Sequence, residues 1–192
     1  MVLSSGHRIL GIDPGSRVCG FALLTAEKKI PTSFKDFRVE DAGVLRADLS
    51  LSFVERIGLL HECLENILPE LKPSVCVIED AFFGNNARSA LKLGQARGAL
   101  ISAVVKKRIP TFEVSPTKVK SMIVGKGRGS KEEIRLALET MLGFRLGSLP
   151  YDAADAVAIA LCQGLSIFSD VAKKKASFRD KRRGSAIENR KT

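Results

Sequence analysis

The chain has 192 residues and a formal net charge of +10, with 45% hydrophobic and 27% charged residues. This balance excludes a wholly disordered chain, and the length fits one domain with a tail. No apolar run approaches the roughly 20 residues of a membrane span, and residues 1–8 lack the apolar core of a secretory signal. The four cysteines have no metal-type spacing, so we expect reduced thiols in a cytoplasmic protein with no membrane partner.

The positive charge is concentrated in two zones. Residues 106–135 hold nine Lys or Arg and three acids, and residues 173–192 hold nine Lys or Arg and two acids. Two basic zones on an otherwise mildly acidic chain suit a polyanionic partner, although a solvated surface and a solubilising tail would give the same composition. We expect a folded domain over residues 1–170 and a basic, disordered tail over residues 171–192.

The first half of the chain predicts strands followed by a helix. Strands are expected at 8–12, 18–24 and 42–46, with a less regular polar stretch at 27–41. Apolar residues then recur at helical spacing over 51–71, and Lys72-Pro73 ends that helix. The compact apolar run at 75–78 predicts a buried strand.

The second half alternates between the two kinds of element. A helix rich in small residues is expected over 87–105, a short strand over 111–114, and a helix that Ser115 caps and Pro116 begins. Ser130 and Glu133 form the pattern of a capping box for the next helix, and the last helix is expected over 151–168. Alternation of this kind predicts an α/β fold whose mixed sheet is antiparallel at the start and parallel afterwards.

Four carboxylates stand where this fold places ligands. Asp13 follows the first strand and Glu79 ends the strand at 75–78, and ligands bind beyond the carboxyl ends of such strands. Asp152 and Asp155 lie three residues apart in the first turn of the last, almost wholly apolar helix, so both project from one face. Taken singly, each acid also fits a turn, a solvated strand end or a helix start. Together they favour hard divalent cations, which prefer oxygen ligands.

Other candidate groups are less specific. The segment 125–131 combines glycines and basic side chains before a helix N-terminus, which favours phosphate, but its spacing differs from that of a Walker A loop. Phe82 and Phe83 follow Glu79 in a predicted loop, where an aromatic pair packs on the body or stacks on an unpaired base. His7 and His61 each stand alone, so zinc is not expected.

The motifs, taken together, resemble those of the RuvC family of Holliday-junction resolvases. The resemblance rests on ILGIDPGSR at 9–17, on Glu79 with Phe82 close behind, on ARSALKLGQARG at 87–98, and on DAADA at 152–156. It covers roughly residues 8–168 in order and spacing. It implies an RNase H-like fold, a mixed β-sheet with helices on both faces, and a homodimer that makes paired nicks in four-way DNA junctions.

The resemblance also implies roles for individual residues. Asp13, Glu79, Asp152 and Asp155 correspond to the acidic tetrad that holds two Mg²⁺ ions, with Mn²⁺ as a substitute, and Lys120 and Lys131 to catalytic basic residues near the scissile phosphate. Phe82 corresponds to an aromatic that stacks at the junction centre. Further candidates for DNA contact are Phe83, Lys118, Lys126 and Arg128. The RuvA and RuvB branch-migration proteins are implied partners.

Two features depart from the family pattern: the tail is longer and more basic than expected, and Asp80 follows Glu79 where a neutral polar residue is expected. The extra acid would perturb metal affinity or act as an outer-shell group. Alternatives are a YqgF-type nuclease acting on RNA and a catalytically inactive junction-binding module. An actin-like ATPase would need a second domain and a second phosphate loop, for which 192 residues leave no room.

Overall fold

The structure is a computed structural model that describes residues 8–27, 31–80, 86–125, 129–143 and 145–164. Its centre is one five-stranded sheet in the order β3-β2-β1-β4-β5. The strands are β1 (Arg8–Asp13), β2 (Val18–Ala26), β3 (Phe37–Arg46), β4 (Val75–Glu79) and β5 (Thr111–Val114). The pairs β1–β2 and β2–β3 are antiparallel, whereas β1–β4 and β4–β5 are parallel. The predicted mixed sheet is therefore confirmed.

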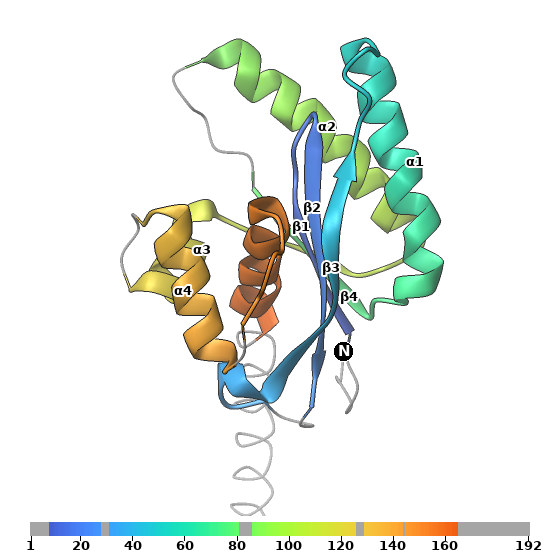
Figure 1. Cartoon of the computed structure of the whole chain (residues 1–192). Helices are drawn as coiled ribbons and strands as arrows, with labels where there is room; N and C mark the ends of the chain where they lie inside the picture. The colour runs from blue at the N-terminus through green and yellow to red at the C-terminus, as the bar shows by residue number, and fades with distance from the viewer. Residues whose placement is uncertain (1–7, 28–30, 81–85, 126–128, 144, 165–192) are drawn as a thin grey trace, which may run out of the picture.

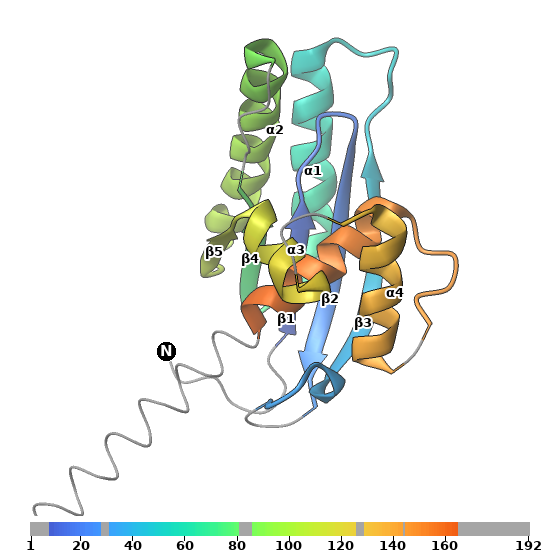
Figure 2. The same ribbon diagram turned by 90° about the vertical axis from the view of Figure 1, so that its left-hand side faces the viewer.

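Helices cover both faces of this sheet (Figures 1 and 2). Helices α1 (Phe53–Leu71) and α2 (Ala87–Lys106) pack side by side on one face. The other face carries α3 (Pro116–Val124), α4 (Lys131–Leu142) and a helix over residues 151–164, which we call the C-terminal helix. The predicted helix starts at Ser115 and Ser130 are confirmed, because each hydroxyl accepts a hydrogen bond from a backbone N–H of the first turn.

The alternation of side chains along the strands divides the core into two layers. Leu10, Ile12, Cys76 and Ile78 pack towards α1 and α2, whereas Ile9, Val75 and Val77 pack towards the C-terminal helix. Successive side chains of a strand point to opposite faces of the sheet. The odd-numbered residues of β1 and β4 therefore lie in one layer of the core and the even-numbered residues in the other. Within the described residues, no helix combines the length and apolarity needed to cross a membrane.

The third strand is longer than predicted. It begins at Phe37 rather than at residue 42, after the short 3₁₀ turn η1 (Phe34–Asp36), so the assignment of 27–41 as irregular is wrong for its last part. Phe37 is buried in the core, and the buried Asp36 carboxylate accepts hydrogen bonds from the backbone N–H groups of Thr32 and Ser33. Because β3 is an edge strand, its exposed polar residues hid the strand pattern.

Two strand glycines let the C-terminal helix lie directly on the sheet. A Cβ atom on Gly11 would stand 2.1 Å from the backbone oxygen of Ala156, and one on Gly20 would stand 1.9 Å from that of Asp152. Real contacts of a Cβ atom are never this short, so only glycine fits either position. Gly20 pairs with Asp13 across β1 and β2. This close approach therefore fixes the start of the C-terminal helix beside the end of β1.

Candidate metal centre

Strand alternation directs Asp13 and Glu79 to the same side of the sheet. Asp13 continues the series Ile9 and Gly11 in β1, and Glu79 continues Val75 and Val77 in β4, all on the face that the C-terminal helix covers. The two strands are adjacent and parallel, with Ile12 opposite Ile78. Asp13 and Glu79 therefore lie side by side at the carboxyl ends of β1 and β4.

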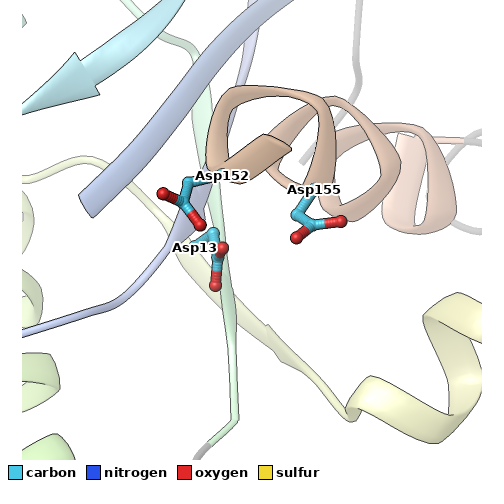
Figure 3. Close-up of side chains that lie close together, drawn as sticks. All are labelled: Asp13, Asp152 and Asp155. Atoms are coloured by element: carbon cyan, nitrogen blue, oxygen red, sulfur yellow. The ribbon is translucent and has the colours of Figure 1, made fainter. Parts of the chain in front are cut away.

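The C-terminal helix brings two more carboxylates to this point. One carboxylate oxygen from each of Asp13, Asp152 and Asp155 lies within 4.8 Å of the other two. The three side chains point towards one another, Asp13 from the strand end and the other two from the first turn of the helix (Figure 3). Glu79 stands outside this tight group but lines the same cleft, together with Asp13 and Asp155. The structure thus brings all four predicted acids to one site.

Burial and mutual repulsion make the charged forms of Asp13, Glu79 and Asp155 unfavourable. Burial, followed by the charges of Glu79, Asp155 and Asp152, raises the pKa of Asp13 from 3.8 to about 8. Burial and then Asp155 raise the pKa of Glu79 from 4.5 to about 7, although Lys120 acts in the opposite direction. Burial also raises the pKa of Asp155. Partly buried carboxylates of this kind need a positive partner to stay ionised together.

Lys131 supplies part of that positive charge. Its Nζ lies 3.4 Å from Asp155 Oδ2 and 3.7 Å from Asp152 Oδ1. Burial works against the charged ammonium, but Asp155 and Asp152 outweigh it and raise the pKa of Lys131. One half-exposed ammonium does not balance four carboxylates. The donor set of oxygen atoms alone, with an excess of negative charge, fits a hard divalent cation such as Mg²⁺.

The remaining predicted site residues divide into three groups. Lys120 lines the same cleft as the acids. The cleft has a volume of about 150 Å³. Lys118 lies on the same helix but is exposed, is absent from the cleft lining, and acts electrostatically on Cys162. Phe82, Phe83, Lys126 and Arg128 lie outside the described residues, as does the basic tail. Their roles in DNA contact therefore stay predictions.

Sequence reasoning missed the environment of Lys131. The Tyr151 ring lies beneath the Lys131 ammonium, with 5.7 Å from Nζ to the ring centroid, and the Arg135 guanidinium lies 5.9 Å from the same centroid. The Tyr151 hydroxyl donates a hydrogen bond to Glu132. These contacts restrict the position of Lys131 at the mouth of the cleft. The signal in the sequence was weak, since it consisted of one aromatic residue directly before Asp152.

Comparisons with known proteins identify the family of the chain. The family model described as crossover junction endodeoxyribonuclease RuvC matches residues 9–163. A protein of that name from Chlorobium chlorochromatii is 39% identical over 154 residues, which is 80% of this chain and 77% of the relative. Another, from Hydrogenovibrio crunogenus, is 39% identical over 156 residues, covering 81% of this chain and 86% of the relative.

Solved structures share the fold of the chain. A structure described as Thermus thermophilus RuvC in complex with a Holliday junction substrate superposes with a TM-score of 0.75 at 27% identity, covering 86% of this chain and 97% of that chain. The yeast mitochondrial Holliday junction resolvase Ydc2 superposes with a TM-score of 0.63 at 14% identity, covering 93% of this chain and 87% of that one. The latter likeness concerns the fold alone.

Proposed function

The chain belongs to the RuvC family of crossover junction endodeoxyribonucleases, and we propose that it resolves four-way DNA junctions by paired, metal-dependent nicking. The observation that carries this proposal is the convergence of Asp13, Asp152 and Asp155 within 4.8 Å, with Glu79 in the same cleft. A YqgF-type nuclease and an inactive junction-binding module are both less well supported. The matching relatives are named as junction endonucleases, and the four acids share one site.

The four acids would hold two Mg²⁺ ions, or Mn²⁺ in their place. When bound, such ions supply a water of lowered pKa and stabilise charge on the leaving oxygen. The tight group of Asp13, Asp152 and Asp155 supports one binding position, and Glu79 would add oxygen ligands on the β4 side of the cleft. The ions would also offset the burial and the repulsion that raise the pKa of Asp13 and Glu79.

The two lysines act on the phosphate rather than on the cation. Lys131 is half-exposed at the mouth of the cleft and already faces the carboxylates, so its ammonium reaches a phosphate bound above them. Lys120 lines the wall of the cleft that α3 forms. Both ammonium groups would stabilise the negative charge that develops on the scissile phosphate in the transition state.

We propose that α2 forms the contact between two copies of the chain. Gly94 and Gly98 lie one turn apart on α2, both are exposed, and a Cβ atom on either would meet nothing within 4 Å. Neither glycine therefore packs α2 onto its own sheet. Leu91 is a largely exposed apolar residue on the same helix. A two-fold dimer supplies two cleavage sites related by symmetry, as paired nicking requires.

Further DNA contacts are proposed from the sequence. Phe82 and Phe83 would stack on bases at the opened junction, and Lys118, Lys126 and Arg128 would contact phosphates. Residues 171–192 would form a basic tail outside the domain of residues 1–170 and strengthen binding to DNA of any shape. RuvA and RuvB are the protein partners that we propose, and the cytoplasm is the proposed compartment.

The decisive experiment maps the nicks in a labelled four-way junction and a linear duplex, with and without Mg²⁺. We expect paired, symmetric nicks in the junction alone, and only with the cation. Asp13→Asn should abolish nicking while junction binding persists, whereas Asp41→Asn makes the same change at an exposed position of β3 and should cut normally. Nicking of junction and duplex at equal rates, or cleavage by Asp13→Asn, would contradict the proposal.

A further inference from the structure

Arg97 of α2 connects three elements beside the candidate metal centre. Its side chain is only 14% exposed, and its Nε donates a 2.9 Å hydrogen bond to the backbone carbonyl of Glu79. Its Nη2 lies 2.9 Å from Glu113 Oε1 of β5 and 3.5 Å from Asp80 Oδ1. One guanidinium therefore joins α2 to the end of β4 and to β5.

The guanidinium contacts the carbonyl of the very residue whose side chain enters the cleft. Glu79 points to the face of α3 and the C-terminal helix, and Asp80 follows it at the end of the strand. The backbone N–H of Asp80 still donates to the carbonyl of Val114, so the pairing with β5 continues through this residue. Side chains alternate along such a backbone, which directs Asp80 to the α2 face, where Arg97 meets it.

Arginine suits this position because its charge and its shape are both used. A largely buried cation is costly unless it is paired, and Glu113 and Asp80 provide two negative partners. The planar guanidinium carries Nε and Nη2 on one rigid group, so Nη2 stays beside the two carboxylates as a charge contact, without a hydrogen bond of its own, while Nε–H donates to the carbonyl of Glu79. A lysine side chain has no such rigid group and cannot fix all three contacts at once.

We infer that Arg97 is a positioning residue for the metal centre: it fixes the end of β4 so that the Glu79 side chain faces the cleft, and it holds Asp80 on the opposite side of the sheet. The extra acid beside Glu79 is then neutralised by Arg97 and does not join the four carboxylates. This inference rests on the proposed function, in which Glu79 binds the catalytic cation.

The test compares Arg97→Ala with Arg56→Ala. Arg56 of α1 is a matched control, because its Nη1 also donates a 2.9 Å hydrogen bond to a partly buried backbone carbonyl, that of Leu51. Nicking of a labelled junction is followed across a Mg²⁺ titration. Binding of Mn²⁺ to the DNA-free protein is measured by electron paramagnetic resonance, and thermal melting reports the fold.

We expect Arg97→Ala to raise the Mg²⁺ concentration for half-maximal nicking about tenfold and to weaken Mn²⁺ binding in parallel. Arg56→Ala should lower the melting temperature without moving either curve. Glu113→Gln keeps Arg97 but removes its shortest ion pair, so it should shift the Mg²⁺ curve in the same direction by about two- to threefold. Arg97→Lys should fall between Arg97→Ala and the unchanged protein.

Two outcomes overturn the inference: Mg²⁺ and Mn²⁺ curves that are unchanged in Arg97→Ala and Glu113→Gln, or a shift in Arg56→Ala as large as that in Arg97→Ala. If Arg97→Ala does not fold, Glu113→Gln and Arg97→Lys decide the question on the same two curves. Nicking by the unchanged protein that needs no cation would contradict the proposed function instead, so the two failures are distinguishable.

Discussion

Asp13→Asn should stabilise the metal-free protein at alkaline pH. The folded protein raises the pKa of Asp13 from 3.8 to about 8, mainly through burial and then through the charge of Glu79. Because the folded state holds this proton more tightly than the unfolded chain, the metal-free protein loses stability as the pH rises from about 4 to about 8. Asparagine never carries that charge, so the variant lacks this loss.

The size of the effect follows from the two pKa values. Each pH unit between 3.8 and about 8 corresponds to about 1.4 kcal/mol, which gives a ceiling of about 6 kcal/mol. Solvent screening and the coupled protonation of Glu79 reduce this value, and we expect a gain of roughly 2 kcal/mol at pH 9. In a domain of this size the gain raises the melting temperature by roughly 4–8 °C.

The assay is thermal melting at pH 5 and pH 9, in chelator and then in Mg²⁺. In chelator the variant should melt slightly above the unchanged protein at pH 5 and well above it at pH 9. Mg²⁺ should stabilise the unchanged protein, because the cation binds only the folded state, and should have little effect on Asp13→Asn. Asp41→Asn controls for the loss of one exposed carboxylate. An unchanged protein whose metal-free stability is equal at pH 5 and pH 9 would refute the reasoning.

Three further predictions concern other parts of the molecule. Lys131→Ala should slow single-turnover nicking by about 10²-fold while junction affinity in a gel-shift assay changes less than threefold, and an equal loss of both would contradict a role in the transition state. Gly20→Ala should lower the melting temperature and the nicking rate, because its Cβ would clash with the start of the C-terminal helix, whereas Gly58→Ala, in open space on α1, should do neither. Gly94→Glu should convert a dimer to a monomer in sedimentation experiments, and a monomeric, fully active unchanged protein would exclude α2 as the proposed contact.

Local sequence patterns predicted most elements because each depends on residues close in the chain. The caps at Ser115 and Ser130 and the strand of 111–114 are examples, since each signal lies within a few residues. The strand β3 was predicted too short, because an edge strand with exposed polar residues has no clear alternation. The type and number of the four acids suggested a shared cation site, but nothing local to Asp152 indicates which strand ends it packs against.

The contact between the C-terminal helix and the sheet shows why such packing cannot be predicted from local sequence. A glycine inside a strand, such as Gly11 or Gly20, indicates that another backbone approaches closely. It does not indicate which segment of the chain that backbone belongs to. The partner lies about 130 to 150 residues away along the chain, as the backbone oxygens of Ala156 and Asp152. The contact is visible only once the sheet order and the helix are both known.

The neighbouring acids Glu79 and Asp80 show that residues adjacent in the chain can lie far apart in function, because their side chains lie on opposite faces of the sheet. The sequence left open whether Asp80 would perturb the metal site, because adjacency in the chain suggests adjacency in space. In an extended strand the reverse holds, since successive side chains point to opposite faces. Val75 and Val77 pack with the C-terminal helix, and Cys76 and Ile78 pack with α1 and α2. The same alternation directs the side chain of Glu79 into the cleft and that of Asp80 towards Arg97. The two adjacent acids therefore belong to different sites.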